Sequence, residues 1–292
     1  MELRQLRYLI AIADEGNLGR AAATLYVSQP ALSYALRRLE TELGLRLFDR
    51  HPGGVTPTPA GRDVIAEARR TVRQAARVTA VADRHRRGRT GVLRVGFEAS
   101  GAGELTTRSR AEFARAHPDV RVEPKRFDWG GETAALRAGD VDVAFVWLPA
   151  DLTGLHSELV HTEPRVVGLP TTHPLASAAS VSIMDVNDEP LMWTRRAPRA
   201  WVDWWAVNPR PDGSEPRWGP TNDNVEEMLE QVAEGTAICF APSSMGLYYT
   251  RPGLTWVPLT DVEPLRVALA WDDDGPLVQA FATIVRELSQ TV

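Results

Sequence analysis

A helical stretch of about 30 residues divides the sequence into two unlike parts. It begins at Thr58-Pro59, a helix cap followed by a proline in the first turn, and runs to about Arg87 with no internal proline. Before it, apolar residues recur at helical spacing in short segments, and from Gly91 onward short apolar strands alternate with helices. The chain has 292 residues, and at about 150 residues per domain this length suggests two domains.

The charges divide at the same place. Residues 1–90 hold 16 basic and 9 acidic residues, a balance of +7, whereas residues 91–292 hold 17 basic and 29 acidic residues, a balance of −12. A basic N-terminal third on an acidic body indicates that this end of the protein meets a polyanion. All nine tryptophans lie in the acidic part, between Trp129 and Trp271.

Composition excludes several classes of protein. Hydrophobic residues make up 43% and charged residues 24% of the chain, which is typical of a globular protein and not of a disordered or fibrous one. The single cysteine, Cys239, excludes an internal disulfide framework and a multi-cysteine metal cluster. The N-terminus lacks an apolar signal segment, and no apolar run approaches the roughly 20 residues of a membrane span. We therefore expect a soluble, cytoplasmic protein with no membrane partner, metal or cofactor.

The segment before the long helix is predicted to form a winged helix-turn-helix. An apolar helical face in 2–15 is followed by two more short helices, for which Asn17 and Ser28 are the expected N-caps. Pro30 is tolerated in the first turn of the third helix. Residues 51–57, which are rich in proline and glycine, then predict a tight β-loop, the wing.

The third helix carries side chains suited to reading double-stranded DNA. The first residues of such a recognition helix face base edges in the major groove. Gln29 can pair with adenine through two hydrogen bonds, Ser33 can reach several bases, and Arg37 suits phosphate or guanine. The other candidates are the cap, a shape-setting proline, a tyrosine and two arginines suited to phosphate: Ser28, Pro30, Tyr34, Arg20 and Arg38. A solvated helix face accounts for Arg38 alone, but not for Gln29, Ser33 and Arg37 together.

The second part of the chain is predicted to be an α/β domain with two lobes. Three apolar strands separated by two helices predict a parallel sheet, with strands at 92–97, 120–127 and 141–147. A second α/β unit starts near Thr162. A strand at 267–271 and a helix at 276–289 are expected to return to the first lobe, which gives two crossovers and a cleft.

Motifs of one family recur along the whole chain. The segment AAATLYVSQPALSYALRRLETELGLRLFDR at 21–50, followed by TPAGR at 58–62, resembles the N-terminal signature of LysR-type transcriptional regulators. Shorter matches to the same family follow: RVG at 94–96, GDVD at 139–142, HPLA at 173–176, EPL at 189–191, VAEG at 232–235 and AP at 241–242.

The resemblance implies a division of the chain into three parts. These are a winged helix-turn-helix DNA-binding domain at 1–58, a linker and dimerisation helix at 59–90, and an effector-binding domain at 91–292 similar to a periplasmic binding protein. We expect one lobe of that domain to comprise 91–161 and 268–292, and the other to comprise 162–267.

Two positions depart from the family pattern. The family usually has a basic residue at the position of Tyr34, and often has basic residues in the wing. Between His51 and Thr58 the only such residue is His51. A minor-groove contact by the wing is therefore in doubt, and the loss of phosphate contacts lowers salt-dependent affinity for DNA.

The long helix is predicted to pair with a second copy of the chain. Small and β-branched residues alternate at spacings of four and three along it, at Val64, Ala68, Thr71, Ala75, Val78 and Ala82. This spacing is typical of a coiled-coil seam. The alternative is packing on its own domain, which is too small to cover a helix of roughly 40 Å. The resemblance implies further pairing through the effector domains into a tetramer, with residues 84–89 as a charged hinge.

The carboxyl ends of the parallel strands predict where an effector binds. The loop after the first strand offers the Ser100 hydroxyl and backbone N–H groups from Gly101 onward, which suit an anion. The family resemblance also places a ligand contact at Ser100. Aromatic and polar side chains expected to complete the site are Trp129, Trp147, Thr194, Trp201 and Phe240. Because tryptophan faces favour a flat apolar body, the expected effector is a hydrophobic or aromatic carboxylate.

The tryptophans of one helix leave an alternative open. Trp201, Trp204 and Trp205 share a helical face, and packing in the core is expected for Trp204 or Trp205. For Trp201, a place in the pocket and plain packing remain equally weighted. Trp218 lies in a proline-rich loop, and nothing in the sequence decides its role.

Enzymatic functions find little support. No metalloprotease or P-loop motif is present, the histidines are scattered, and Cys239 lies in an apolar strand typical of the core. We expect no catalytic residues. Two alternatives to a ligand-responsive regulator are a solute-binding module and an architectural DNA-binding protein without an effector. The helix-turn-helix argues against the first, and the predicted cleft argues against the second.

Overall fold

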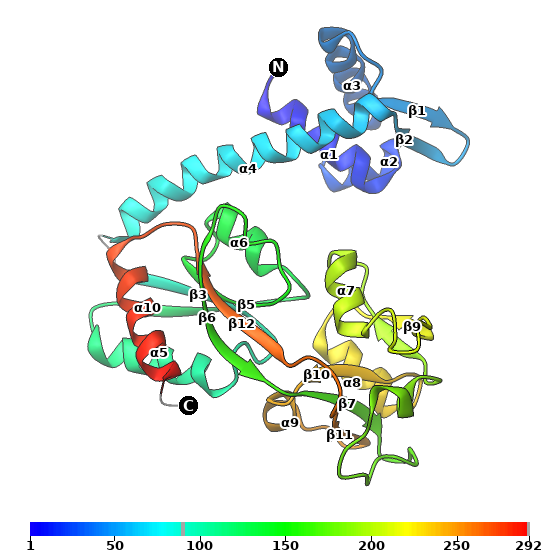
Figure 1. Ribbon diagram of the computed structural model, residues 1–292. Helices are drawn as coiled ribbons and strands as arrows, with labels where there is room; N and C mark the ends of the chain where they lie inside the picture. The colour runs from blue at the N-terminus through cyan, green and yellow to red at the C-terminus, as the bar shows by residue number, and fades with distance from the viewer. Residues whose placement is uncertain (89–90, 291–292) are drawn as a thin grey trace. The chain divides into compact units, whose positions relative to one another are not determined.

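The computed structural model describes residues 1–88 and 91–290, except for the side chains at 73, 76, 77 and 79–88. The chain divides into two units, Met1–Ala82 and Asp83–Val292 (Figure 1). This boundary falls within the long helix α4 (Pro59–Gly88), which lies in the predicted linker at 59–90.

Three helices and a hairpin form the body of the first unit. The helices are α1 (Leu3–Glu15), α2 (Leu18–Thr24) and α3 (Gln29–Leu43), and the hairpin strands are β1 (Phe48–His51) and β2 (Gly54–Pro57). Asn17 caps α2 by accepting from the backbone N–H groups of Gly19 and Arg20. Ser28 caps α3 by accepting from Ala31 N at 3.4 Å. The predicted winged helix-turn-helix is therefore confirmed, with both expected N-caps in place.

The core of this unit is built from one apolar face of each helix. Leu9, Ile12, Leu32 and Leu39 are at most 1% exposed. The wing is attached to the turn after α1, because Val55 N donates to the carbonyl of Gly16 at 2.9 Å. A side chain at Gly54 would place its Cβ 2.2 Å from that same carbonyl oxygen, so only glycine fits at this point of the hairpin.

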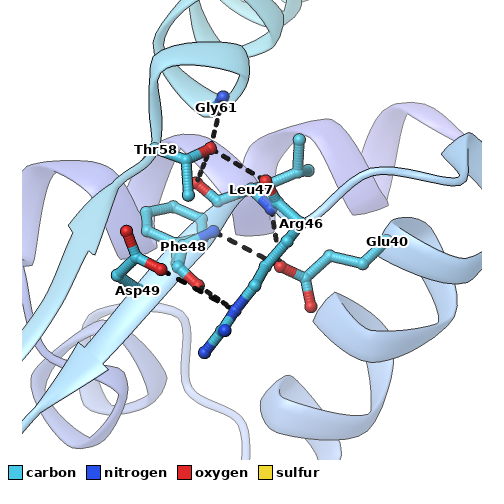
Figure 2. Close-up of polar contacts among 7 residues, drawn as sticks. All are labelled: Glu40, Arg46, Leu47, Phe48, Asp49, Thr58 and Gly61. Atoms are coloured by element: carbon cyan, nitrogen blue, oxygen red, sulfur yellow. Dashed lines mark hydrogen bonds and ion pairs between the residues drawn. The ribbon is translucent and has the colours of Figure 1, made fainter.

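A polar joint connects α3, the wing and the start of α4 (Figure 2). The Glu40 carboxylate accepts from the backbone N–H groups of Leu47 at 2.8 Å and Phe48 at 3.3 Å. The Thr58 hydroxyl donates to the carbonyl of Arg46 at 2.8 Å and accepts from Gly61 N at 2.9 Å. The joint therefore fixes the wing and the first turn of α4 relative to the recognition helix.

The first half of α4 packs on its own domain. Ile65 and Ala68 belong to the core of the first unit, and Val64 and Val72 pack against it. Further along, Val78 is 71% exposed. Of the predicted seam, Val64 and Ala68 are therefore engaged within the chain, and the side chain of Ala82 lies outside the described residues. The side chains of the predicted hinge at 84–89 also lie outside the described residues.

A five-stranded sheet forms one half of the second unit, in the order β4-β3-β5-β12-β6. Strands β3, β4 and β5 are parallel, as predicted, and β12 runs antiparallel to both β5 and β6. Their bounds are β3 (Val92–Glu98), β4 (Arg121–Phe127), β5 (Val143–Trp147), β6 (His156–Glu163) and β12 (Leu265–Trp271). Helices cover both faces: α5 (Glu104–Ala116) and α10 (Pro276–Ser289) share the main core, and α6 (Glu132–Ala138) covers a smaller cluster.

The other half of the second unit contains two smaller sheets (Figure 1). Strand β7 lies between β10 and β11 and is antiparallel to both, and β8 pairs in parallel with β9. The strands are β7 (Arg165–Pro170), β8 (Leu191–Trp193), β9 (Trp218–Thr221), β10 (Cys239–Pro242) and β11 (Leu254–Pro258). The helices are α7 (Arg199–Ala206), α8 (Val225–Ala233) and α9 (Met245–Tyr248), with a 3₁₀ turn at Ile183–Val186.

The strands that connect the two halves differ in extent from the sequence prediction. Strand β6 was not predicted and continues to Glu163, and β12 begins at Leu265, so the five-stranded sheet extends beyond 161 and begins again before 268. The reason is that both strands keep pairing with each other through this region, Leu265 with Glu163. Within the described residues, no helix is both long and apolar enough to cross a membrane.

Replacing Gly61 with alanine tests the joint at the start of α4. Helix propensity alone favours alanine by about 0.5–1 kcal/mol, but a Cβ at Gly61 would lie 2.0 Å from the carbonyl oxygen of Leu47. We expect Gly61→Ala to destabilise the first unit by about 1–3 kcal/mol. Hydrogen exchange of residues 1–58, measured by mass spectrometry in the full chain, would be faster.

Ala66→Gly is the matched control, because Ala66 is exposed on the same helix. Ala66→Gly changes helix propensity by a similar amount but brings no atom close to the carbonyl of Leu47. If Gly61→Ala exchanged as slowly as the unmodified chain, the close approach of α4 to Leu47 would be refuted.

Candidate functional site

The start of α3 presents an exposed polar surface. Ser28, Gln29, Pro30, Arg37 and Arg38 are all exposed. Two further predicted residues lie on the same helix: Tyr34 is 64% exposed and Ser33 is half-buried. The surface combines amide, hydroxyl and guanidinium groups, which suit base edges and phosphates.

Two arginines near this surface are engaged within the protein. The Arg50 Nη2 on β1 donates to the Ser33 hydroxyl at 3.4 Å. Arg20 forms an ion pair with Glu15, with 3.5 Å between Nε and Oε2, and donates to the Glu15 carbonyl. Both guanidinium groups stay exposed, and such surface contacts are weak enough to be exchanged for phosphate.

Arg50 was missed by the sequence analysis, which counted the wing only from His51. The wing strand β1 begins at Phe48, so a basic residue does lie on it. The β-loop between Phe48 and Pro57 is the signal that locates Arg50 on the wing.

A tryptophan-lined pocket lies in the second unit. Four of the predicted effector residues line it with Thr194: Trp129, Trp147, Trp201 and Phe240. The lining also includes Trp193, Trp205, Trp218 and Asn222, and contains no charged side chain. The pocket encloses about 570 Å³ together with its mouth, and most of its lining side chains are apolar.

The rings of the pocket come from both halves of the unit. The ring centroids of Trp129 and Trp201 are 6.2 Å apart, and those of Trp147 and Trp205 are 5.5 Å apart. The Trp129 indole N–H donates to Asn222 Oδ1 at 2.7 Å, and the Trp147 indole N–H donates to the Gly101 carbonyl at 2.6 Å. The Trp205 indole nitrogen is buried and has no hydrogen-bond partner in the described part of the chain.

The structure places the three remaining tryptophans of this region. A place in the core was expected for Trp204 or Trp205, and Trp205, which is 8% exposed, belongs to the core cluster and also lines the pocket. Trp204 does not line it, and its indole N–H donates to Glu263 at 3.3 Å. Trp218, which the sequence left undecided, lines the pocket from β9.

The loop after β3, where the sequence predicts an anion site, has its donors engaged within the protein. Ser100 and Gly101 do not line the pocket. The Ser100 hydroxyl bonds to the Ser244 hydroxyl at 2.8 Å, and Ser244 in turn bonds to Glu163. The N–H groups of Gly101, Ala102 and Gly103 donate to Glu98, Thr106 and Ser100. The fold itself uses these donors in this structure, and an anion anchor at Ser100 and Gly101 stays a prediction.

Comparison with known proteins decides the family. Residues 3–62 match the family model for the bacterial regulatory helix-turn-helix protein, lysR family, and residues 86–290 match that for the LysR substrate binding domain. The chain belongs to the LysR family.

Similar proteins match over most of the chain. The HTH-type transcriptional regulator AlsR of Bacillus subtilis is 28% identical over 292 residues, which cover 97% of this chain and 95% of AlsR. The small neutral protease regulatory protein of Streptomyces coelicolor is 36% identical over 243 residues, which cover 80% of this chain and 65% of that protein. The solved structure of full-length BenM, a regulator from Acinetobacter baylyi, is 26% identical, covers 100% of this chain and 97% of its own, and has a TM-score of 0.55.

These findings confirm the prediction of a LysR-type DNA-binding transcriptional regulator with an effector-binding domain. They also support a regulator over an enzyme, since the relatives are transcriptional regulators. Cys239 is buried, and burial raises the pKa of its thiol to about 12, so it is an unreactive core residue as expected. No group of histidine, cysteine and acidic side chains in the described ranges is arranged to hold a metal ion.

A pair of buried glutamates lies beneath the loop that carries Trp129 in this LysR-family domain. Glu98, at the end of β3, is 1% exposed, and Glu132, at the start of α6, is 2% exposed. Glu98 Oε2 accepts from Gly130 N at 2.7 Å, while Oε1 of each glutamate lacks a partner among the described residues. Burial and the charge of Glu132 raise the pKa of Glu98 well above its usual range, and burial raises the pKa of Glu132 to about 7. One shared proton would satisfy both carboxyl groups.

The raised pKa of Glu132 predicts that the second unit loses stability as pH rises. The folded state keeps the proton that the unfolded chain releases near pH 4.5, so stability falls between about pH 4.5 and 7 and stays low above that. Glu132→Gln should flatten this dependence and stabilise the unit at pH 8 by on the order of 2–3 kcal/mol. Urea unfolding followed by tryptophan fluorescence reports this unit alone, because all nine tryptophans lie between residues 129 and 271.

The matched control is Glu234→Gln, at an exposed glutamate that follows α8 in the same unit. It should leave the slope of stability against pH unchanged. An unmodified slope in Glu132→Gln would mean that the glutamates do not share a proton.

Proposed function

We propose that this LysR-family regulator recognises its operator DNA through the exposed start of α3. Gln29, Ser33, Tyr34 and Arg37 face base edges, with Ser28 and Pro30 setting the start of the helix, while Arg20 and Arg38 hold the backbone phosphates. The observation that carries the proposal is the exposed cluster of Gln29 and Arg37 on a helix whose opposite face is fully packed by Leu32 and Leu36. We further propose that the protein acts in the cytoplasm, where its DNA target lies.

The wing contributes a phosphate contact through Arg50 in this proposal. Its guanidinium is exposed and lies within hydrogen-bonding distance of α3, so one side chain can touch both Ser33 and the DNA backbone. Arg50 compensates in part for Tyr34, which stands where the family usually has a basic residue.

Exchange of Gln29 tests base readout. Gln29→Ala should cost about 1–3 kcal/mol on the specific site and relax the preference at one base position, because a bidentate contact is lost. Arg38→Ala should weaken binding to all sequences alike, because phosphate contacts carry no sequence information. Selection of bound duplexes from a random library by each full-length variant measures both effects. A selected profile for Gln29→Ala identical to that of the unmodified protein would contradict the assignment.

We also propose self-association through α4, as a dimer that pairs further into a tetramer. The part of the seam not engaged with the first unit's core comprises Thr71, Ala75 and Val78, and Val78 is largely exposed. An apolar stripe that continues past the domain's own core favours a partner helix.

A charge in this stripe tests the dimer. Ala75→Glu should dissociate it, because an unpaired carboxylate in a helix seam is costly to bury. Ala66→Glu is the control, since Ala66 is exposed on another face of α4. Light scattering of the full chain should show a lower mass only for Ala75→Glu. Equal masses for the two variants would remove the seam from the interface.

For the effector, we propose a small hydrophobic or aromatic carboxylate in the pocket formed by Trp129, Trp147, Thr194, Trp201 and Phe240. The apolar lining, which is rich in tryptophan, supports an aromatic body. Rings from both halves of the unit line the pocket, so a molecule bound there would change the packing between them and thereby the presentation of the DNA-binding domains.

A further inference from the structure

Two buried arginines lie directly behind the aromatic wall of the pocket. Arg165, the first residue of β7, and Arg210, in the segment after α7, are each 2% exposed. Their guanidinium groups donate to consecutive carbonyls at the end of α7: Arg165 to Trp204 and Trp205, and Arg210 to Ala206 at 2.5 Å. Arg210 Nε also donates to Asn187 Oδ1 at 3.1 Å.

Carboxylates offset the positive charge of this pair only in part. Glu263 acts on Arg165 and Asp212 acts on Arg210, but neither arginine forms an ion pair within 4 Å among the described residues. Arg165 Nε and Arg210 Nη2 also have no hydrogen-bond partner there. The end of a helix offers only about half a negative charge to two cations. Burial and the nearby charge of Arg210 lower the pKa of Arg165 to about 9, and the charge of Glu263 opposes this shift.

Aromatic rings of the pocket wall lie in contact with both guanidinium groups. The Arg165 guanidinium lies 4.9 Å from the ring centroid of Trp205 and 5.7 Å from that of Phe240, and the Arg210 guanidinium lies 5.5 Å from the Phe240 ring. Both rings line the pocket. Because neither ring carries a net charge and the pocket is apolar, the potential of the two cations is poorly screened there.

The same wall holds an unused hydrogen-bond donor. The indole nitrogen of Trp205 is buried without a partner, whereas those of Trp129 and Trp147 are satisfied by Asn222 and Gly101. A buried donor without a partner costs free energy that an acceptor on a ligand would recover.

We infer that the pocket binds a flat aromatic carboxylate with its anionic end at this wall, where Trp205 Nε1 donates to it and Arg165 and Arg210 attract it. The inference rests on the proposed effector pocket and assigns three residues to effector recognition that sequence analysis did not. Thr194 and the remaining tryptophans would then contact the apolar body.

Trp205→Phe in the full-length protein gives the sharpest test. It removes the free indole N–H while keeping an aromatic ring, and the folded protein loses no internal hydrogen bond. The probes are phenylacetate and its uncharged near-isostere phenylacetamide, compared by calorimetric titration. We expect phenylacetate to bind the unmodified protein about tenfold more tightly than phenylacetamide, and Trp205→Phe to weaken phenylacetate about tenfold.

Trp204→Phe is the matched control, because Trp204 is the neighbouring residue and its indole N–H bonds to Glu263 outside the pocket. It should change the affinity for phenylacetate less than twofold. Arg210→Gln should abolish the preference for the charged probe. Arg210→Lys should retain part of it, since lysine keeps the positive charge but lacks the planar guanidinium with its several N–H donors. If Arg210→Gln fails to fold, the comparison of the two tryptophan variants still decides.

Three outcomes would overturn the inference: equal affinity for the two probes, equal effects of Trp205→Phe and Trp204→Phe, or no binding of phenylacetate at about 10 mM. Equal affinities with intact Arg165 and Arg210 would mean that the arginines only hold the end of α7. Duplex selection by the same protein separates this from the proposed function. A chain that still selects a specific DNA site but ignores phenylacetate remains a regulator with a different class of effector.

Discussion

The second unit depends on burying large indole rings together with their N–H groups. A buried indole needs a hydrogen-bond acceptor for its single donor. Trp129, from the loop after β4, finds it in Asn222 after β9, and Trp147 finds it in the backbone of the loop after β3. These bonds fix the loops around the pocket, and the ring contacts between Trp129 and Trp201 then hold the two halves at one spacing.

Local signals account for how much of the first unit could be predicted from the sequence. The caps Asn17 and Ser28, the glycine stops and the helical spacing of apolar residues act over a few residues, and each works as expected. The partner of the seam on α4 was harder to predict, because the spacing of its apolar residues is the same whether the helix packs on its own domain or on a second copy. Only the structure shows that Ala68 belongs to the core of the first unit while Val78 does not.

The pocket could be predicted only in part. Its aromatic lining residues follow from nearby sequence, but its polar contacts join residues that lie far apart in the chain. Trp129, Trp147 and Phe240 could be inferred from strand ends, and Trp201 from the start of a helix. The partner of Ser100 is Ser244, 144 residues further along the chain, and no local pattern announces it. Strands β9 and β11 are short and partly exposed, and β6 alternates weakly, so their apolar patterns gave no signal. A place in the core was expected for Trp204 or Trp205, and the ring of Trp205 is large enough to be buried in the core and to line the pocket as well.

Buried acidic and basic side chains lie on different sides of the pocket, and this arrangement favours one orientation of a bound anion. The carboxyl pair of Glu98 and Glu132 lies beneath the loop of Trp129, and Glu98 is two residues from Ser100. The guanidinium pair of Arg165 and Arg210 lies behind Trp205 and Phe240. A ligand carboxylate placed near Ser100 would meet donors that are already used, and it would lie close to the buried carboxyl groups of Glu98 and Glu132. The same carboxylate turned toward Trp205 meets a free donor and two cations. In an apolar cavity, where charges are poorly screened, this difference orients a molecule that hydrophobic contact alone would leave free to bind either way round.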